Sequence, residues 1–521
     1  MNQQVKHIVI LGGGSAGWLT AGVLAAEHMA NDANGIQVTL VESPDIKTVG
    51  VGEGTWPSMR TTLQKMGVSE TDFMRCCDAA FKQGSKFAAW HTNNVEDAYY
   101  HPFSLPAEFS QHNLAMAWQQ YREQVRFDHA VSFQSHICDR GLAPKQIATP
   151  EYAFVANYGY HLDAGKFAQF LTQHCTEKLG VKHAQANVLE VKSHTNGDIA
   201  SLITDVAGEI AGDLFIDCSG SRSRLLGEHL GINNINLQRY LFNNTALAVH
   251  VPYASQDENF ASHTLSTGQQ AGWTWDIALP SRRGCGYVFS DAHTSIDEAE
   301  QVIRDYVAQA SSAEYAKQAE LKQIKFNPGH KQKFWHNNCV AVGMAAGFIE
   351  PLEASALVLV ELSAQMISEQ LPQNRQVMDI VAARFNAKFS ERWQQIVDFL
   401  KVHYVLSKRD DSAYWLDNRD DSSIPQSLQD NLNLWRYQSP WHFDATHTES
   451  LFSSASYQYV LYGMGFETLK RTHKTQSQAK LMQEAERLFA ETARKSNQVV
   501  SQLPTNRELN LKIHQYGFQK I

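Results

Sequence analysis

A glycine-rich turn between a buried strand and a helix constrains the fold of this chain more than any other feature. Residues 5–11 are apolar and β-branched, which is typical of a buried strand, and glycines follow directly. Residues 12–17 read Gly-Gly-Gly-Ser-Ala-Gly and fit the GxGxxG pattern. A helix is expected over 15–30 and a second strand over 37–41. This order of elements predicts a βαβ unit that binds a dinucleotide.

The positions of this motif have separate physical tasks. Gly12 permits a tight turn, Gly14 lets a pyrophosphate approach the backbone, and Gly17 lets the helix pack closely on the strand. Glu42 ends the second strand, where its carboxylate is placed to accept hydrogen bonds from ribose hydroxyls. The motif alone does not separate FAD from NAD.

Three later segments favour FAD. They are a strand around Val188, the run 213–220 that ends in Asp-Cys-Ser-Gly, and the run 339–344 that leads to Pro351 and a helix. Such segments return the chain to the cofactor in FAD hydroxylases. The sequence contains no second GxGxxG motif for NAD(P)H, so we expect reduced flavin to be supplied from outside.

The composition excludes several other classes of protein. With 45 Lys and Arg against 54 Asp and Glu, the net charge is -9, whereas a general nucleic-acid binder needs a basic surface. A hydrophobic content of 43% is enough for a sizeable core. The seven cysteines form no CxxC pair, so neither a disulfide framework nor a metal site is indicated. Without a long apolar window or a signal-peptide core, a cytoplasmic protein away from membranes is expected.

The remaining pattern predicts an α/β fold with an antiparallel sheet and a helical end. Residues 58–90 are expected to be largely helical, and strand patterns between 245 and 290 indicate an antiparallel sheet on the substrate side. We therefore expect a Rossmann-like FAD-binding domain of the flavin monooxygenase type. Its core is expected over 1–360, including the inserted sheet and a loop region over 95–160, with a mostly helical lobe over 361–521 that covers the substrate site.

Four segments give the chain a specific resemblance. They are the glycine turn extended to Trp18, the run Gly-Val-Gly-Glu-Gly-Thr-Trp-Pro at 50–57, the run Gly-Trp-Thr-Trp-Asp-Ile at 272–277, and the run Phe-Ile-Glu-Pro-Leu-Glu at 348–353. On these residues the chain resembles a flavin-dependent halogenase of the tryptophan halogenase family. The third run matches the family's WxWxI signature. The resemblance implies that its tryptophans, Trp273 and Trp275, separate the flavin site from the substrate site.

Lys82 matches the family's essential lysine. The resemblance implies that reduced FAD and O2 give a flavin C4a-hydroperoxide, which oxidises chloride or bromide to hypohalous acid. The lysine then holds this electrophile by hydrogen bonding or forms a haloamine with it, and burial would help by excluding water. Lys86, one helical turn further on, is the rival, and a solvated helix lysine is the ordinary alternative.

Glu353 matches the family's active-site glutamate. A carboxylate there can stabilise the cationic arenium intermediate and accept its proton. The alternative is a glutamate placed for the helix dipole, because Pro351 fits the first position of a helix. The backbone N–H groups of Ser355 and Ala356 correspond to the family's halide site, although the family's usual Ser-Thr-Gly is Ala-Ser-Ala here.

The remaining expected site residues follow from the motif and the resemblance. Those expected to bind FAD are Gly12, Gly14, Ser15, Ala16, Gly17, Glu42, Val51, Val188, Met344 and Leu357. Those expected to face the substrate are His101, Phe103 and Tyr457, with Trp441, Phe452 and Tyr459 as further aromatic candidates. No metal ligand is expected.

The substrate and the reaction class are left open by the sequence. Tryptophan, a free indole and another electron-rich arene all fit, and so do chloride and bromide. A separate flavin reductase is the expected partner, and a homodimer is one open oligomeric state. Two other functions also fit, namely a single-component FAD-dependent aromatic hydroxylase or epoxidase and a non-catalytic flavin-binding regulator. Substrate-stimulated NAD(P)H oxidation by the purified protein alone would favour the hydroxylase.

Overall fold

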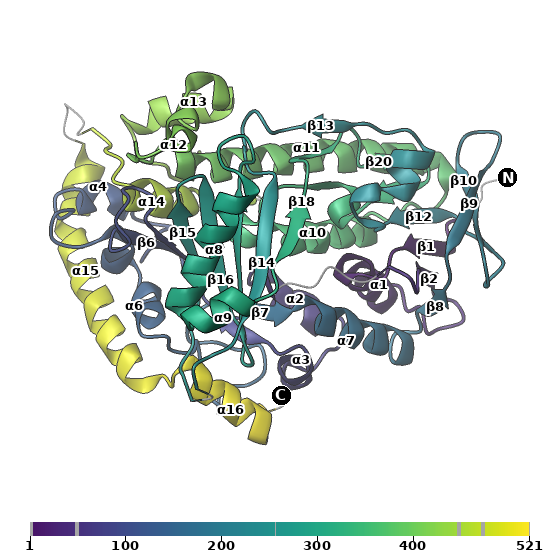
Figure 1. Cartoon of the computed structure of the whole chain (residues 1–521), viewed down its shortest axis with the longest axis horizontal. Helices are drawn as coiled ribbons and strands as arrows, with labels where there is room; N and C mark the ends of the chain where they lie inside the picture. Colours follow the sequence, from purple (N-terminus) through teal and green to yellow (C-terminus); the bar gives the residue numbers. More distant parts are fainter. Residues whose placement is uncertain (1–3, 47–51, 256, 445–449, 470–474, 520–521) are drawn as a thin grey trace. The chain divides into compact units, whose positions relative to one another are not determined.

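The computed structural model of the chain describes residues 4–46, 52–255, 257–444, 450–469 and 475–519. Its contacts divide the chain into two compact units, each assembled from three separate stretches. Figure 1 labels helices and strands of both units. Unit 1 comprises Met1–Ala79, Leu162–Leu237 and Phe326–Trp393. Unit 2 comprises Ala80–His161, Gln238–Lys325 and Gln394–Ile521.

Unit 1 is built on a six-stranded sheet with the strand order β20-β21-β12-β1-β2-β8. At its centre, β1 (His7–Leu11) runs parallel to β2 (Gln37–Glu42) on one side and to β12 (Leu214–Asp217) on the other. The helix α1 (Ser15–Glu27) joins β1 to β2 and packs against α7 (Ala164–Glu177). The parallel strands and their crossover helix form the predicted βαβ unit.

The remaining strands of this sheet and the other strands and helices of unit 1 complete the unit. In chain order they are β3 (Gly52–Gly54), α2 (Ser58–Lys65), α3 (Glu70–Cys76), β8 (Lys182–Gln185), β9 (Val188–Ser193), β10 (Ile199–Thr204), β11 (Glu209–Ala211), β13 (Asn234–Asn236), β19 (Gly329–Lys331), β20 (Trp335–His336), β21 (Cys339–Ala341), β22 (Gly347–Phe348) and α10 (Ser355–Glu369).

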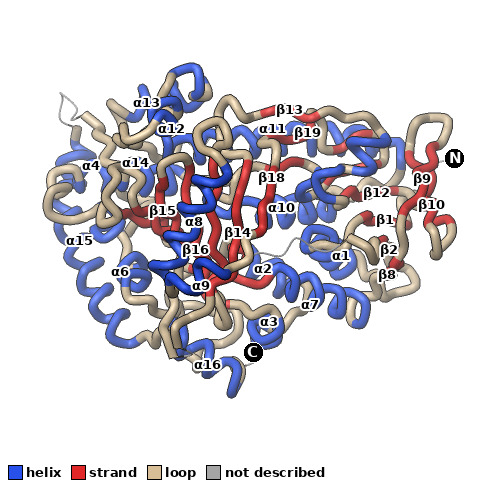
Figure 2. The backbone as a smooth tube through the Cα atoms, viewed as in Figure 1, coloured by secondary structure: helices blue, strands red, loops and turns tan. Residues whose placement is uncertain are grey.

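Unit 2 is built on a seven-stranded sheet with the strand order β18-β14-β17-β16-β15-β5-β6. Neighbouring strands are antiparallel except for β15 (Thr264–Gln269) and β5 (Gly84–Ala88), which are parallel. The helix α8 (Ile296–Ala310) covers β14 (Thr245–Val251) and β17 (Arg283–Phe289), and Figure 2 shows it lying over these strands. The predicted antiparallel sheet is therefore present, with one parallel pair.

Helices make up most of the rest of unit 2. Its other elements are β4 (Ala80–Lys82), β6 (Ala98–Pro102), α4 (Leu114–Trp118), α5 (Phe127–Val131), α6 (Gln134–Asp139), β16 (Gly272–Ala278), α9 (Ala313–Gln318), β18 (Lys322–Lys325), α12 (Ala413–Asp417), α13 (Gln426–Trp435), α14 (Ser454–Gly463), α15 (Gln476–Gln502) and α16 (Asn506–Tyr516). Two elements, β7 (Gly159–Asp163) and α11 (Arg375–Val405), contribute residues to both units.

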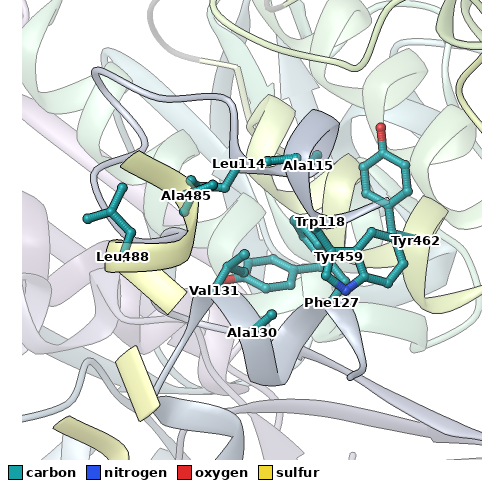
Figure 3. Close-up of a cluster of buried hydrophobic side chains, with 11 residues drawn as sticks. Leu114, Ala115, Trp118, Phe127, Ala130, Val131, Tyr459, Tyr462, Ala485 and Leu488 are labelled. Carbon is teal, nitrogen blue, oxygen red and sulfur yellow. The ribbon is translucent and has the colours of Figure 1, made fainter. Parts of the chain in front are cut away.

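An aromatic core joins the 100–131 region of unit 2 to its C-terminal helices. The rings of Trp118, Phe127 and Tyr462 are buried there, with Tyr459 beside them and Leu488 of α15 at the edge (Figure 3). The ring centroids of Phe127 and Tyr462 lie 5.1 Å apart. Among the described helices, none combines the length and the apolar character that a membrane crossing needs.

The structure corrects one prediction about local structure. Residues 58–90 are helical only in α2 and α3, and the chain then continues as the strands β4 and β5. Lys82 and Lys86 lie on these strands and are not one turn apart on a helix. The strands form because β4 pairs with β7, and β5 pairs with β6 and β15. The division at residue 360 falls inside α10 and stays a prediction about which part of the chain covers the substrate.

Candidate active site

The glycine turn has the tight packing that its motif requires. Gly12 has a left-handed φ of +119°, and a Cβ atom built on it would lie 2.2 Å from the carbonyl oxygen of Cys218. A Cβ atom on Gly17 would lie 1.9 Å from the carbonyl oxygen of Gly12. Real side chains never approach so closely, so any other residue at either position would displace the backbone.

Gly14 is different, because a Cβ atom built on it would meet no atom within 4 Å. Gly14 is also the N-cap of α1, and no side chain caps this end of the helix. The N–H groups of Ser15 and Ala16 belong to the first turn of α1, where the helix itself offers them no acceptor. A helix N-terminus of this kind favours an anionic group, so the residues present fit the pyrophosphate of a dinucleotide.

Glu42 lies at the end of β2, as predicted, but its carboxylate has a partner within the protein. Its Oε2 lies 2.9 Å from Nε2 of His183, and the His183 ring packs edge-on against Trp18 with centroids 4.9 Å apart. A Cβ atom on Gly13 would lie 2.0 Å from the carboxyl carbon of Glu42. The carboxylate is therefore held over the glycine turn by His183, which the sequence patterns did not single out.

Three other predicted FAD residues occupy different surroundings. Val188 is half-buried at the start of β9, and Leu357 is buried in α10. Met344 is exposed in a short 3₁₀ turn. That turn approaches the glycine motif, since a Cβ atom on Gly343 would lie 2.7 Å from the Cβ atom of Ala16. Val51, the last of the set, lies outside the described residues.

The segment before α10 holds two consecutive non-glycine residues in the left-handed region. Glu353 has φ 64° and ψ 6°, and Ala354 has φ 54° and ψ 46°. Such residues are unfavourable by on the order of 1–3 kcal/mol each and are typical of functional sites. The Glu353 side chain is buried, and its carbonyl oxygen accepts a 2.8 Å hydrogen bond from Nε1 of Trp56.

This geometry corrects the expected first residue of the helix that follows Pro351. The helix begins at Ser355 with Ala354 as its N-cap, so Pro351 is not the first helical residue and Glu353 lies outside α10. No side chain caps α10. Ser355 is buried and Ala356 is exposed, and their N–H groups belong to the first turn of the helix, where an anion is favoured.

Lys82 is buried in β4, with 1% of its surface exposed. Its Nζ lies 5.3 Å from the centroid of the Phe103 ring. The backbone N–H of Phe103 donates to the carbonyl of Gln83 at 3.0 Å, which holds the ring beside the lysine. Lys86 is only half-buried, and its Nζ lies over the ring of Tyr100. The structure thus separates the two lysines by burial and by aromatic partner.

A histidine that the sequence analysis did not single out shares the interior with Lys82. His161 is fully buried in β7, and its Nε2 lies 2.8 Å from the Thr264 hydroxyl. Burial and then the charge of Lys82 hold the pKa of His161 well below its usual value. The imidazole is therefore neutral at pH 7, and His161 adds no positive charge beside Lys82.

Two of the predicted substrate residues meet around one phenylalanine of α11. The Phe399 ring lies 5.5 Å from His101 and 5.0 Å from Tyr457, between ring centroids. It also stacks on Phe452 at 3.8 Å. Phe399 was not predicted, because a phenylalanine within a long helical pattern has no signal that separates it from an ordinary core residue.

The other two aromatic candidates in this part of unit 2, Tyr459 and Trp441, use their polar atoms to bind backbone carbonyls of the same unit. Tyr459 belongs to the buried core, and its hydroxyl donates to the Ser104 carbonyl at 3.1 Å. Trp441 Nε1 donates to the Phe109 carbonyl at 3.1 Å. These contacts attach the 95–115 segment to α14 and to the connection between α13 and α14 in the same unit.

Trp273 and Trp275 lie on one face of β16, with ring centroids 6.3 Å apart. Both are buried, and the Trp275 ring occupies the space that a side chain on Gly286 would fill. Trp273 continues into an aromatic cluster, since its centroid lies 6.2 Å from that of Trp90. The two rings therefore form a buried aromatic surface within unit 2.

Comparison with known proteins identifies the family. The tryptophan halogenase family model matches residues 7–480. The chain belongs to the tryptophan halogenase family. A crystal structure of a tryptophan halogenase from Shewanella frigidimarina is 50% identical in sequence to this chain and has a TM-score of 0.95. The match covers 100% of this chain and 99% of the Shewanella chain.

Two more distant members extend the family relationship. The 7-chloro-L-tryptophan 6-halogenase KtzR of Kutzneria sp. (strain 744) is 32% identical and covers 83% of this chain and 85% of its own. Xcc4156, a flavin-dependent halogenase from Xanthomonas campestris, is 30% identical, covers 98% of this chain and 99% of its own, and has a TM-score of 0.86.

Family membership decides between the classes that the sequence left open. The predicted resemblance and the predicted fold class are confirmed, and the protein is an enzyme of the flavin-dependent halogenase type. The hydroxylase and the non-catalytic regulator are therefore set aside. Within the described residues, no group of three or more His, Cys, Asp or Glu side chains is arranged to hold a metal ion.

Proposed function

We propose that the protein uses reduced FAD, O2 and chloride or bromide to halogenate an electron-rich aromatic such as tryptophan or a free indole. The observation that carries this proposal is Lys82, a buried lysine whose Nζ lies 5.3 Å from the Phe103 ring centroid. Reduced FAD, when bound, would activate O2, and O2 would take up the two electrons that halide loses on becoming electrophilic halogen. The residues of the chain then have three tasks, which are binding, delivery and proton removal.

Binding falls to the helix starts. The N–H groups that follow Gly14 would hold the FAD pyrophosphate, and the Glu42 carboxylate, held by His183, would accept hydrogen bonds from the ribose hydroxyls. The N–H groups of Ser355 and Ala356 at the start of α10 would hold the halide. Both sites use backbone donors that need no reorganisation when an anion arrives.

Delivery falls to Lys82. A dry amine or ammonium can retain hypohalous acid, which water would otherwise disperse, and can direct it toward one face of the substrate ring. The walls of that substrate site would be His101, Phe103 and Tyr457, whose flat rings suit an arene. Trp273 and Trp275 would close the side toward the flavin.

Proton removal falls to Glu353. Its buried carboxylate would stabilise the arenium cation that follows electrophilic attack and would then accept the ring proton. The strained backbone at Glu353 fits this task, since strain of this kind is kept where geometry matters more than stability.

The partner and the location follow as part of the same proposal. The absence of a second dinucleotide motif in the sequence supports a separate flavin reductase as the source of reduced FAD. The sparse cysteines without CxxC pairs support a reducing, cytoplasmic setting. Whether the protein acts as a homodimer is answered by its mass in solution.

The test is to incubate the purified protein with a flavin reductase, NADH, FAD, bromide or chloride, and a panel of tryptophan and free indoles. Mass spectrometry should show a halogen isotope pattern on at least one arene. The same mixture with Lys82→Ala protein should show none, while that variant still binds FAD. Product from the Lys82→Ala mixture, or no product across the whole panel, would contradict the proposal.

A further inference from the structure

A buried glutamate in the middle of α10 has no task in the proposed function. Glu361 has 4% of its surface exposed, and Leu357, Val358 and Val360 beside it on the helix are buried apolar residues. Burial raises the pKa of Glu361 to about 7, and two hydroxyl hydrogen bonds lower it only in part. A carboxyl group is unfavourable in such surroundings, where an apolar side chain would be expected. Glu361 is therefore a candidate for a specific role.

Both carboxylate oxygens of Glu361 accept hydrogen bonds from α2. The Ser58 hydroxyl donates to Oε1 at 3.1 Å, and the Thr62 hydroxyl donates to Oε2 at 2.6 Å. Ser58 and Thr62 are four residues apart, so they lie on one face of α2, one above the other. The carboxylate therefore fixes both the position and the rotation of α2 on α10.

A second contact joins the same two segments at the strained turn. Trp56 lies two residues before α2 begins, and its Nε1 donates to the carbonyl oxygen of Glu353. Glu353 and Ala354 are the two left-handed residues before α10. A strained backbone persists only where its surroundings hold it in place, and the Trp56 hydrogen bond is one such restraint.

We propose that Glu361 is a positioning residue that clamps α2 to α10 and thereby keeps the Trp56 indole N–H on the Glu353 carbonyl. All of these contacts lie within unit 1. The inference deepens the proposed function and rests on it for the role of Glu353. The clamp itself is a statement about structure that holds whether or not Glu353 acts on a substrate.

The first test measures hydrogen exchange by mass spectrometry in three variants. Glu361→Leu removes both acceptors, Glu361→Gln keeps a polar group of the same shape, and Gln365→Leu is the control at an exposed position one turn further along the same helix. In Glu361→Leu, peptides from 52–65 and 352–358 should exchange roughly tenfold faster, while peptides of β1 stay unchanged. Glu361→Gln and Gln365→Leu should match the wild-type chain.

The second test measures product formation and FAD binding in the same variants. Glu361→Leu should form halogenated product about tenfold more slowly at unchanged FAD affinity, because the displaced carboxylate of Glu353 is no longer in line with the substrate. Glu361→Gln should restore the rate to within about twofold. If Glu361→Leu does not fold, Thr62→Val, which removes one donor at nearly constant volume, takes its place with the same expectation.

The outcomes separate this inference from the proposed function. Unchanged exchange over 352–358 in Glu361→Leu would overturn the clamp, and so would faster exchange throughout unit 1, which would indicate general core damage. A wild-type chain that halogenates nothing, but shows the expected exchange pattern, would overturn the proposed function and leave the clamp standing.

Discussion

The glycine turn and the strand that carries Lys82 are built in opposite ways. In the turn, the geometry depends on missing side chains, since Gly12 and Gly17 leave room for a backbone carbonyl and Gly14 leaves room for a ligand. Around Lys82, it depends on side chains that are present, namely Phe103 at its Nζ and the neutral His161 nearby. Substitutions in the turn should therefore change shape, whereas substitutions at the lysine should change chemistry and leave the fold intact.

The largest expected effect is at Lys82. Lys82→Ala should keep the melting temperature and the FAD affinity of the wild-type chain but lose halogenated product by more than about 10²-fold, since the electrophile is no longer held in place. Liquid chromatography with mass spectrometry, beside a flavin-oxidation assay, measures both. Lys86→Ala is the matched control and should stay near wild type. An inactive Lys86→Ala variant beside an active Lys82→Ala variant would show that Lys86, and not Lys82, delivers the electrophile.

Glu353 shares features with both regions, because its backbone has an unusual conformation and its carboxylate is proposed to act on the substrate. Glu353→Gln keeps the shape but removes the charge, so the rate of product formation should fall on the order of 10²–10³-fold. The KM for the arene should change little, and steady-state kinetics with saturating reduced FAD would show this division. A rate within a factor of two of wild type would remove the carboxylate from the mechanism.

The glycine turn allows a sharper comparison within itself. Gly14→Val should fold normally, because its Cβ meets no protein atom, and should bind FAD at least about tenfold more weakly, a loss of about 1.4 kcal/mol. Gly17→Ala should lower the melting temperature, because its Cβ would clash with the Gly12 carbonyl. Flavin fluorescence and thermal unfolding measure the two effects. Wild-type FAD affinity in a folded Gly14→Val protein would refute pyrophosphate binding at this turn.

The smallest effect is expected at Ala354. Its left-handed φ of 54° is unfavourable for alanine but not for glycine. Ala354→Gly should therefore raise the free energy of unfolding by roughly 0.5–1 kcal/mol, after the loss of chain entropy in the unfolded state is counted. Urea unfolding is sensitive enough to detect this. A decrease in stability would show that contacts of the Ala354 methyl group outweigh the backbone strain.

The predictions from sequence succeeded where local geometry decides the structure. The strand, the glycine turn and α1 follow from adjacent residues, and they appear within a few residues of the expected bounds. The region of Lys82 was predicted as helix, since β4 and β5 are short and gain their pairing partners from β6, β7 and β15 further along the chain. His161, His183 and Phe399 were missed for the same reason, because each has a role only through contacts that are distant in sequence.

Unit 1 is assembled from stretches that are far apart in the sequence, and this has a consequence for synthesis on the ribosome. Its central sheet places β21, which begins at Cys339, directly beside β12, which ends at Asp217. At a translation rate of roughly 5–20 residues per second, the growing chain waits on the order of ten seconds with the β12 edge unpaired. An open hydrophobic edge strand is a site for pairing with other chains. Faster translation of residues 218–341, or a chaperone that occupies this edge, should therefore raise the soluble yield of the protein.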